Sequence, residues 1–370
     1  MFRHVAAFEF RYQLRSPVFW TTTLLFALLT FGAVTSDQVQ IGSIGNVKKN
    51  SPFAIANTLG VMAIFAVFIM AAFVSNVVVR DDETGYGPIV RATRVSAFDY
   101  LFGRFTGAFV VGCLAFAGVP LAMLIGSYMP WIDPDTLGPL RFGDYVYVYF
   151  VLAVPTLLMM GAFCFALATM TRSMVTTYVG VVVLLMIYFV STAFFRRPEY
   201  ERIVALVEPF GMGAFGYVTK YWTATERNSQ LPPFAGLIFW NRLIWLGAGM
   251  LLLGVAGVLY KREGKRERRR TAAADEGPVV VGSGSPVVSG FSRTRLVSGL
   301  SRPLVVSGLS RTTQLLALAR FDMAAVFRSP AFFVLLAFGF LNSIAGLWFA
   351  NEDLYGNPFY PVTRIMIQTL

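Results

Sequence analysis

The chain has 370 residues, of which 56% are hydrophobic and only 14% are charged, and its mean hydropathy is +0.63. Soluble globular domains are about 25% charged, so the composition predicts an all-α polytopic membrane protein and excludes an ordinary soluble enzyme. The net charge of +11 includes a basic segment directly after an apolar run, which indicates membrane topology rather than a nucleic-acid partner.

Residues that carry chemistry are scarce in this sequence. It holds one histidine, His4, and two cysteines, Cys113 and Cys164, which lie inside apolar runs. One histidine leaves no zinc-binding constellation, and no Gly-x-x-x-x-Gly-Lys-Ser/Thr sequence is present to cradle a nucleotide. We therefore expect no cofactor, no metal and no catalytic residue, and we expect both cysteines to be small side chains packed within the membrane.

The first predicted element is an amphipathic helix over Met1–Ser16. Its apolar residues alternate with arginines, which is typical of a helix that lies in the membrane interface with its arginines in water. A cleavable signal peptide is the alternative interpretation. It is disfavoured because the next apolar run lacks a small-residue cleavage site and is long enough to span a bilayer.

Six apolar runs follow, and together they predict a six-span helical bundle over residues 17–260. A helix needs about 20 apolar residues to cross the hydrocarbon core. The predicted spans are Pro17–Val34, Phe53–Val79, Phe105–Met129, Tyr145–Met170, Val175–Phe195 and Phe234–Tyr260. We expect Pro120 to break the third span, and Arg242 in the sixth must pair or reach the interface. The semi-apolar segment 196–233 is expected to lie against the membrane or to dip partly into it.

A charged stretch, Arg80–Arg104, separates the second and third runs. It contains four basic and four acidic residues, whereas the runs on both sides contain none. This pattern predicts a loop at one face of the membrane. Balanced charge is poor for lipid anchoring and suits a specific polar contact with another protein, although an ordinary solvated loop is the simpler interpretation.

The orientation is predicted from the segment Lys261–Arg270, which has seven basic residues directly after the sixth run. Such a cluster marks the cytosolic side, so we expect a cytosolic N-terminus, a cytosolic Arg80–Arg104 stretch and a location in the cytoplasmic (inner) membrane. Residues 261–312 read as a basic cytosolic linker. It repeats the sequences VSGFSR and VSGLSR, a composition that favours disorder.

A longer repeat connects the start of the chain with its end. The matching pairs, each at an offset of 313 residues, are Phe8-Glu9 with Phe321-Asp322 and Arg15–Phe19 with Arg328–Phe332. Each copy leads directly into an apolar run. We interpret residues 313–370 as the start of a second copy of the first half, with an interfacial helix and a seventh span, in a truncated piece of a duplicated membrane protein.

Short motifs in the charged stretch resemble those of a known family. Glu83-Thr84-Gly85, Thr93–Ser96 and Tyr100–Arg104 are similar to the loop of ABC-2 type permeases, the membrane halves of ATP-driven transporters. Arg94 stands where that family has proline. The resemblance covers roughly residues 1–260, with a restart at 313.

The resemblance implies a function and partners. A permease subunit would move an unidentified substrate by using ATP hydrolysis on a separate ATPase subunit, beside membrane lipid and a second permease half or a homodimer partner, without nucleic acid. The residues that it implicates in contact with the ATPase are Arg80, Asp81, Asp82, Glu83, Gly85, Arg91, Thr93, Val95, Ser96, Tyr100, Gly103 and Arg104.

A narrower resemblance leaves an alternative open. Glu208–Gly211 and Tyr221–Asn228 look like the outer loop of bacterial permeases that are fused to a gluzincin-type metallo-aminopeptidase. The peptidase motif His-Glu-x-x-His is absent, so no peptidase activity is expected here, but the chain could anchor a downstream peptidase without transporting anything. A channel or an ion-coupled carrier is a weaker hypothesis, since no predicted span holds an acidic residue.

Overall fold

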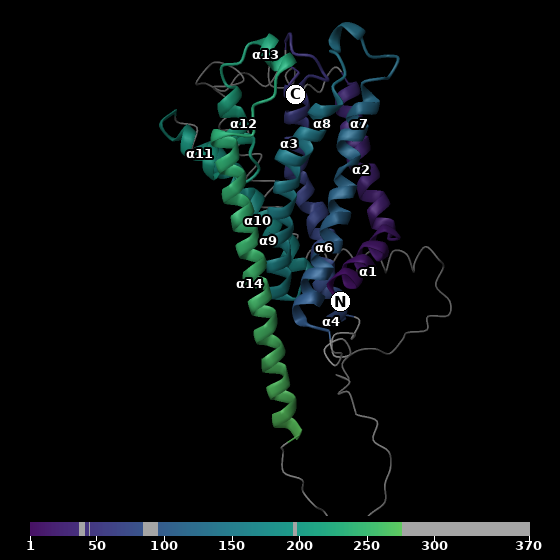
Figure 1. Cartoon of the computed structure of the whole chain (residues 1–370), viewed down its shortest axis with the longest axis vertical. Coiled ribbons are helices and arrows are strands. Elements are labelled where there is room, and N and C mark those ends of the chain that lie inside the picture. The colour runs from purple at the N-terminus through teal and green to yellow at the C-terminus, as the bar shows by residue number, and fades with distance from the viewer. Residues whose placement is uncertain (37–40, 44, 84–94, 195–197, 276–370) are drawn as a thin grey trace, which may run out of the picture. The chain divides into compact units, whose positions relative to one another are not determined.

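The structure is a computed structural model that describes residues 1–36, 41–43, 45–83, 95–194 and 198–275, with only the backbone described for 81–83, 193, 194, 198 and 261–275. Throughout these ranges the secondary structure is helical, without a strand. Six helices are long and apolar enough to cross a membrane (Figure 1). The chain is therefore an all-α polytopic membrane protein, as its composition predicts.

The six spans follow a short first helix, α1 (Phe2–Leu14). Spans 2 and 4 each contain a π-helical turn, and span 3 is broken once. Span 1 is α2 (Pro17–Thr35), and span 2 consists of α3 (Pro52–Met70), η1 (Ala71–Ser75) and α4 (Asn76–Glu83). Span 3 consists of α6 (Ala97–Phe116) and α7 (Gly118–Gly126), and span 4 of α8 (Phe142–Val148), η3 (Tyr149–Ala153) and α9 (Val154–Thr171). Span 5 is α10 (Met174–Phe194), and span 6 lies in α14 (Gly236–Asp275).

A Ser-Pro pair begins each of the first two spans. The hydroxyl oxygen of Ser16 accepts a hydrogen bond from the amide of Val18, and that of Ser51 accepts one from the amide of Ala54. The proline that follows each serine has no N–H group to leave unpaired, and its fixed φ suits the first helical position. The sequence therefore sets where both helices begin.

Prolines also account for two of the irregular turns. A proline inside a helix removes the hydrogen bond to the carbonyl four residues earlier and clashes with that carbonyl. For Pro120 this carbonyl belongs to Phe116, where α6 ends; for Pro155 it belongs to Val151, within the π-helical turn η3. The break that was predicted at Pro120 is confirmed. The turn η1 of span 2 contains no proline.

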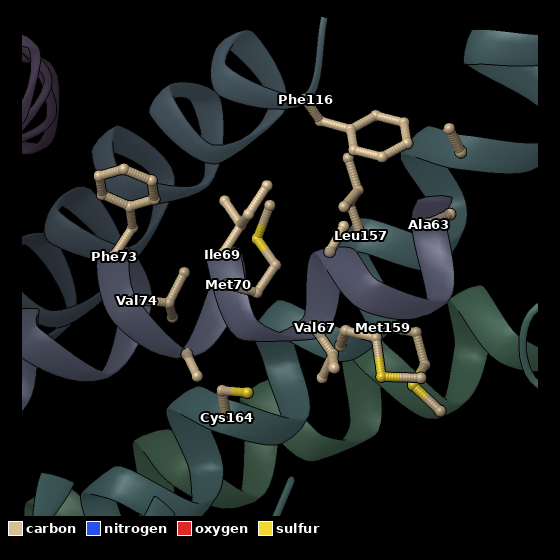
Figure 2. Close-up of a cluster of buried hydrophobic side chains, with 14 of the residues drawn as sticks. Ala63, Val67, Ile69, Met70, Phe73, Val74, Phe116, Leu157, Met159 and Cys164 are labelled. Carbon is tan, nitrogen blue, oxygen red and sulfur yellow. The ribbon is translucent and has the colours of Figure 1, made fainter. Parts of the chain in front are cut away.

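Spans 2 and 4 form the core of the bundle. Within one apolar 18-residue window of each span, 72% and 67% of the residues are buried in spans 2 and 4. The corresponding shares are 22%, 22% and 17% in spans 1, 5 and 6. Met70 of span 2 fits between two glycines, because a Cβ atom at Gly112 would lie 2.4 Å from its Cε and one at Gly161 would lie 3.5 Å from its sulfur. Figure 2 shows Met70 in the apolar cluster that it shares with Leu157 of span 4.

Helix α1 packs closely on α6 at two glycines. A Cβ atom added at Gly103 would lie 3.1 Å from the carbonyl oxygen of Phe2, and one at Gly107 would lie 2.6 Å from the carbonyl oxygen of Ala6. Only a hydrogen atom fits in these positions, so the backbones of the two helices approach each other directly. This contact places α1 against the second and third turns of span 3.

Two predicted boundaries differ from the structure. Arg80–Arg104 is not a loop at its ends, because span 2 continues as helix to Glu83 and span 3 begins at Ala97, capped by Ser96. Span 6 continues as helix α14 to Asp275, into the predicted linker. The rest of the linker and the second half predicted over 313–370 lie outside the described residues.

The close contact between α1 and α6 gives a first testable prediction. Replacing Gly107 with alanine should force α1 away from α6 and lower the free energy of unfolding by about 1–3 kcal/mol, the usual cost of overpacking. The matched control is Gly247→Ala in α14, where a Cβ atom would meet nothing within 4 Å. Thermal denaturation in detergent measures both; equal midpoints for the two variants would contradict the prediction.

Candidate functional site

The candidate site is built around a carboxylate that α1 buries against the bundle. Glu9 is completely buried, and Gln13, one turn later on the same face, is nearly so. A buried carboxylate costs several kcal/mol in desolvation unless cations and hydrogen bonds compensate for the loss of water. The surroundings of Glu9 supply both.

Two arginines from different spans hold the carboxylate. Oε2 of Glu9 lies 2.9 Å from Nη2 of Arg80, at the end of span 2, and 3.0 Å from Nε of Arg104, at the start of span 3. The second nitrogen of Arg80 donates to Oε1 at 3.4 Å. The side chain of Arg104 is 5% exposed and that of Arg80 is 18% exposed. One carboxylate therefore connects α1, α4 and α6.

Neighbouring side chains complete this Glu9 cluster, which we define as Glu9, Gln13, Arg80, Arg104, Tyr12 and Tyr100. The amide nitrogen of Gln13 donates to Oε1 of Glu9 at 2.7 Å, and Nη1 of Arg104 donates to the hydroxyl of Tyr100 at 2.5 Å. The guanidinium of Arg80 lies over the ring of Tyr12, 4.1 Å from its centroid. These contacts fix both guanidinium planes as well as the carboxylate.

The same glutamine reaches the irregular turn of span 2. The amide nitrogen of Gln13 also donates to the backbone carbonyl of Phe73, at 3.2 Å, within the π-helical turn η1. A π-helical turn disturbs the regular pattern of backbone hydrogen bonds, and a side chain from another helix can satisfy a carbonyl that the turn displaces. Helix α1 is thus attached to span 2 at two points, Phe73 and Arg80.

This geometry joins three elements at one end of the bundle. Figure 1 places α1, α4 and the start of α6 together at one end of the bundle, which we call the α1 end. Both α4 and α6, the helices on either side of segment 84–94 in the sequence, are fixed to α1 through Glu9. The described residues contain no group of histidine, cysteine or acidic side chains that could hold a metal ion.

The predicted site residues fall into three groups. Arg80 and Arg104 pair with Glu9 of α1, Gly103 packs against α1, and the hydroxyl of Tyr100 accepts a hydrogen bond from Arg104. Ser96 caps α6, after a half-buried Val95. The backbone of Asp81, Asp82 and Glu83 is helical, but their side chains lie outside the description. Gly85, Arg91 and Thr93 lie outside the described residues altogether.

Sequence reasoning missed Glu9 and Gln13, the residues that organise the site. Glu9 is the only acidic residue in the first sixteen positions, and the repeat carries an acidic residue, Asp322, at the equivalent position. A lone acid among arginines, preserved as an acid in a repeat, is the signal that could have identified it. Gln13 had no such signal, because the equivalent position is Val326.

A second polar cluster lies at the opposite end of the bundle, where α11 (Glu201–Val207), α12 (Met212–Thr219) and α13 (Ala224–Ser229) are found (Figure 1). Its centre is Arg242 of span 6, which is 1% exposed. The guanidinium donates to the carbonyl of Leu152 in the π-helical turn η3 and to the hydroxyl of Thr156. Arg242 therefore pairs within the protein instead of reaching the interface.

The loop between α11 and α12 depends on this arginine and its neighbour Asn241. The amide nitrogen of Asn241 donates to the carbonyls of Ala205, Leu206 and Glu208, at 3.0, 2.8 and 2.8 Å. Gly211 has φ +81°, and a Cβ atom there would lie 2.2 Å from Nη2 of Arg242. Only glycine fits both the backbone angle and the space beside the guanidinium.

The carboxylate of Glu208 orders the same loop from its other side. It accepts hydrogen bonds from the amides of Phe210, at 2.9 Å, and Gly213, at 3.1 Å. Phe210 is buried and its ring meets that of Tyr188 edge-on, with 4.6 Å between centroids. Glu208–Gly211 was noted above for its resemblance to an outer loop. In the structure Glu208, Phe210 and Gly211 each stabilise the loop between α11 and α12.

Comparisons with known proteins do not assign the chain to a family. No protein-family model matches it, and a search of curated proteins finds no match.

The Glu9 cluster gives a second prediction. Glu9→Gln keeps the size of the side chain but removes the buried carboxylate that both guanidinium groups contact, so we expect the free energy of unfolding to fall by about 3–5 kcal/mol. The control is Glu201→Gln, which breaks the half-exposed ion pair with Lys220 and should leave the midpoint unchanged within error. Thermal denaturation of both variants in the same detergent makes the comparison, and a Glu9 variant as stable as the control would refute the cluster's role.

The Arg242 cluster gives a third prediction. Asn241→Leu leaves the carbonyls of Ala205, Leu206 and Glu208 without their donor, so the free energy of unfolding should fall by at least about 2 kcal/mol. Asn57→Leu in span 2 is the control, because its amide nitrogen donates to a carbonyl of its own helix, that of Phe53. The two midpoints are compared as above. The prediction fails if Asn57→Leu is the more damaging change.

Proposed function

We propose that the chain is the membrane-spanning permease subunit of an ABC-2 type transporter in the cytoplasmic membrane, driven by ATP hydrolysis on a separate ATPase subunit. The observation that carries the proposal is the Glu9 cluster. It holds the two helix ends that flank segment 84–94 rigidly to α1 and to each other. A surface that receives a mechanical push must be connected stiffly to the helices that it moves.

The mechanism follows from what the chain contains and what it lacks. The sequence has no phosphate-binding loop of the Walker type, so energy would have to enter through contact with another protein. The charged segment at the α1 end is the surface proposed for that contact, with the N-terminus and this end of the bundle in the cytosol. Two permease halves, or two copies of the chain, would then rock against each other as the ATPase subunits close.

The resemblance gives the coupling residues separate tasks under this proposal. Arg80 and Arg104 pair with Glu9 of α1, Gly103 packs against α1 and Tyr100 contacts Arg104, so these residues would position the surface. The residues between them would make the contact itself. Substitutions in the first group should therefore damage the fold, whereas substitutions in the middle of the segment should damage coupling alone.

The fourth prediction tests the contact. Reversing charges in the variant Asp81→Lys/Asp82→Lys/Arg91→Glu should reduce co-purification of an ATPase subunit, and the ATP hydrolysis that accompanies it, at least about tenfold, because like charges would now face each other. The tagged full chain is expressed in its own host, and mass spectrometry identifies any co-purified protein with a phosphate-binding loop.

The matched control is Glu199→Lys/Glu201→Lys/Arg202→Glu, which reverses the same number and kinds of charge at the opposite end of the bundle. It should leave co-purification and ATP hydrolysis as in the wild type. Unchanged co-purification in the Asp81 variant, with the wild-type chain retaining an ATPase, would overturn the proposed contact.

The alternative is a membrane anchor for a downstream metallo-aminopeptidase, which the resemblance of Glu208–Gly211 motivates. The two functions differ in what accompanies the chain. A His-Glu-x-x-His motif further along the same reading frame, without a neighbouring gene for an ATPase, would favour the anchor. An ATPase that co-purifies with the wild-type chain would favour the transporter.

A further inference from the structure

The outward face of α1 is positively charged and has exposed aromatic rings. Glu9 and Gln13 turn inward, so the exposed residues of the helix include Arg3, Arg11 and Arg15 but no acidic side chain. None of these three arginines has an ion pair or side-chain hydrogen bond to a residue that the structure describes. Burial of the only carboxylate of α1 therefore leaves a purely cationic surface.

The helical period aligns these groups. Residues 4, 8, 11 and 15 follow the spacing of one helix face, so Phe8, Arg11 and Arg15 form one stripe opposite the buried Glu9. Phe8 is 63% exposed, and its ring stacks on that of Tyr12, with 6.3 Å between centroids. The stripe combines cations with aromatic rings, and its aromatic part touches the Glu9 cluster at Tyr12.

The depth of this stripe relative to a membrane follows from the next helix. Ser16 joins α1 directly to span 1, and Trp20 in the first turn of that span is exposed. Exposed tryptophan is typical of the boundary between lipid headgroups and hydrocarbon. Span 1 is also among the least buried, with Leu24 and Leu28 exposed on its outer side. Arg11 and Arg15 precede Trp20 by nine and five residues, so they belong on the headgroup side of this boundary.

From this arrangement we infer that the outward stripe of α1, made by Phe8, Arg11 and Arg15, binds the headgroup of an anionic phospholipid. The phosphate and the net negative charge of such a lipid complement two arginines that pair with no carboxylate among the described residues, and exposed Phe8 can enter the upper acyl region. Charge complementarity together with continuity with a lipid-facing span favours lipid over a soluble protein as the occupant. A lipid bound there would contact the exposed face of α1, and the Glu9 cluster lies on the opposite, buried face of the same helix.

The test measures lipid binding to the purified full chain in neutral detergent. Native mass spectrometry with added phosphatidylglycerol or phosphatidylcholine gives an apparent dissociation constant for each lipid. The wild type should bind phosphatidylglycerol more tightly, and raising the salt concentration before exchange should weaken that preference. Each basic residue near an anionic headgroup is worth about fivefold in binding, so Arg11→Gln/Arg15→Gln should weaken phosphatidylglycerol binding at least about tenfold.

Two variants serve as controls. Arg141→Gln/Arg202→Gln removes the same charge from exposed positions at the opposite end of the bundle and should leave phosphatidylglycerol binding unchanged. Arg11→Lys/Arg15→Lys keeps the charge and should retain most of the affinity. All three variants should keep the wild-type unfolding midpoint, because the substituted side chains are exposed.

The remaining outcomes would overturn the inference. Unchanged phosphatidylglycerol binding in Arg11→Gln/Arg15→Gln would do so, as would an equal loss in the Arg141 and Arg202 control. Displacement of the lipid by inorganic phosphate at the same concentration would identify a free-phosphate site instead. Loss of a co-purifying ATPase with intact lipid binding would identify the stripe as a protein-docking surface.

Discussion

The arrangement of the α1 end depends on one buried carboxylate. Burial removes water from the carboxylate of Glu9, and only strong, well-oriented hydrogen-bond donors can offset that desolvation. Arg80, Arg104 and Gln13 provide these donors. Because each donor comes from a different place in the chain, moving α1, span 2 or span 3 independently would leave a buried charge without compensation. The energetic penalty for that separation makes the three elements move together. Rigidity at this end is therefore a consequence of charge burial rather than of apolar packing alone.

The same constraint, with the sign of the charge reversed, operates at the other end. Arg242 is buried among neutral acceptors, including the carbonyl of Leu152 in the π-helical turn of span 4. Gln13 makes the equivalent bond to Phe73 in the π-helical turn of span 2. A bilayer offers no water to a displaced backbone carbonyl, so an irregular turn in a span requires a donor from elsewhere in the protein. The two most buried spans thus carry the irregular turns, and a side chain from another element stabilises each of them.

Hydropathy was enough to predict the six spans, since a run of apolar residues has few alternatives in a membrane, and the Ser-Pro pairs and Pro120 marked helix starts and a break. The charged stretch was harder. From charge alone, Arg80 and Arg104 were predicted to lie in a loop. In the structure both arginines lie on helices and contact Glu9, which only the three-dimensional position of Glu9 reveals. The turn η1 contains no proline and left no trace in the sequence. Pairing between elements distant in the chain is the information that a single sequence lacks.

Two arginines of the stretch Arg80–Arg104 contact α1. The stretch has four basic and four acidic residues, and two of the basic residues, Arg80 and Arg104, form ion pairs with Glu9. The outward face of α1 is cationic, because its only acid is buried. Burying Glu9 against two arginines thus joins α1 to spans 2 and 3 and leaves the exposed charged residues of α1 cationic.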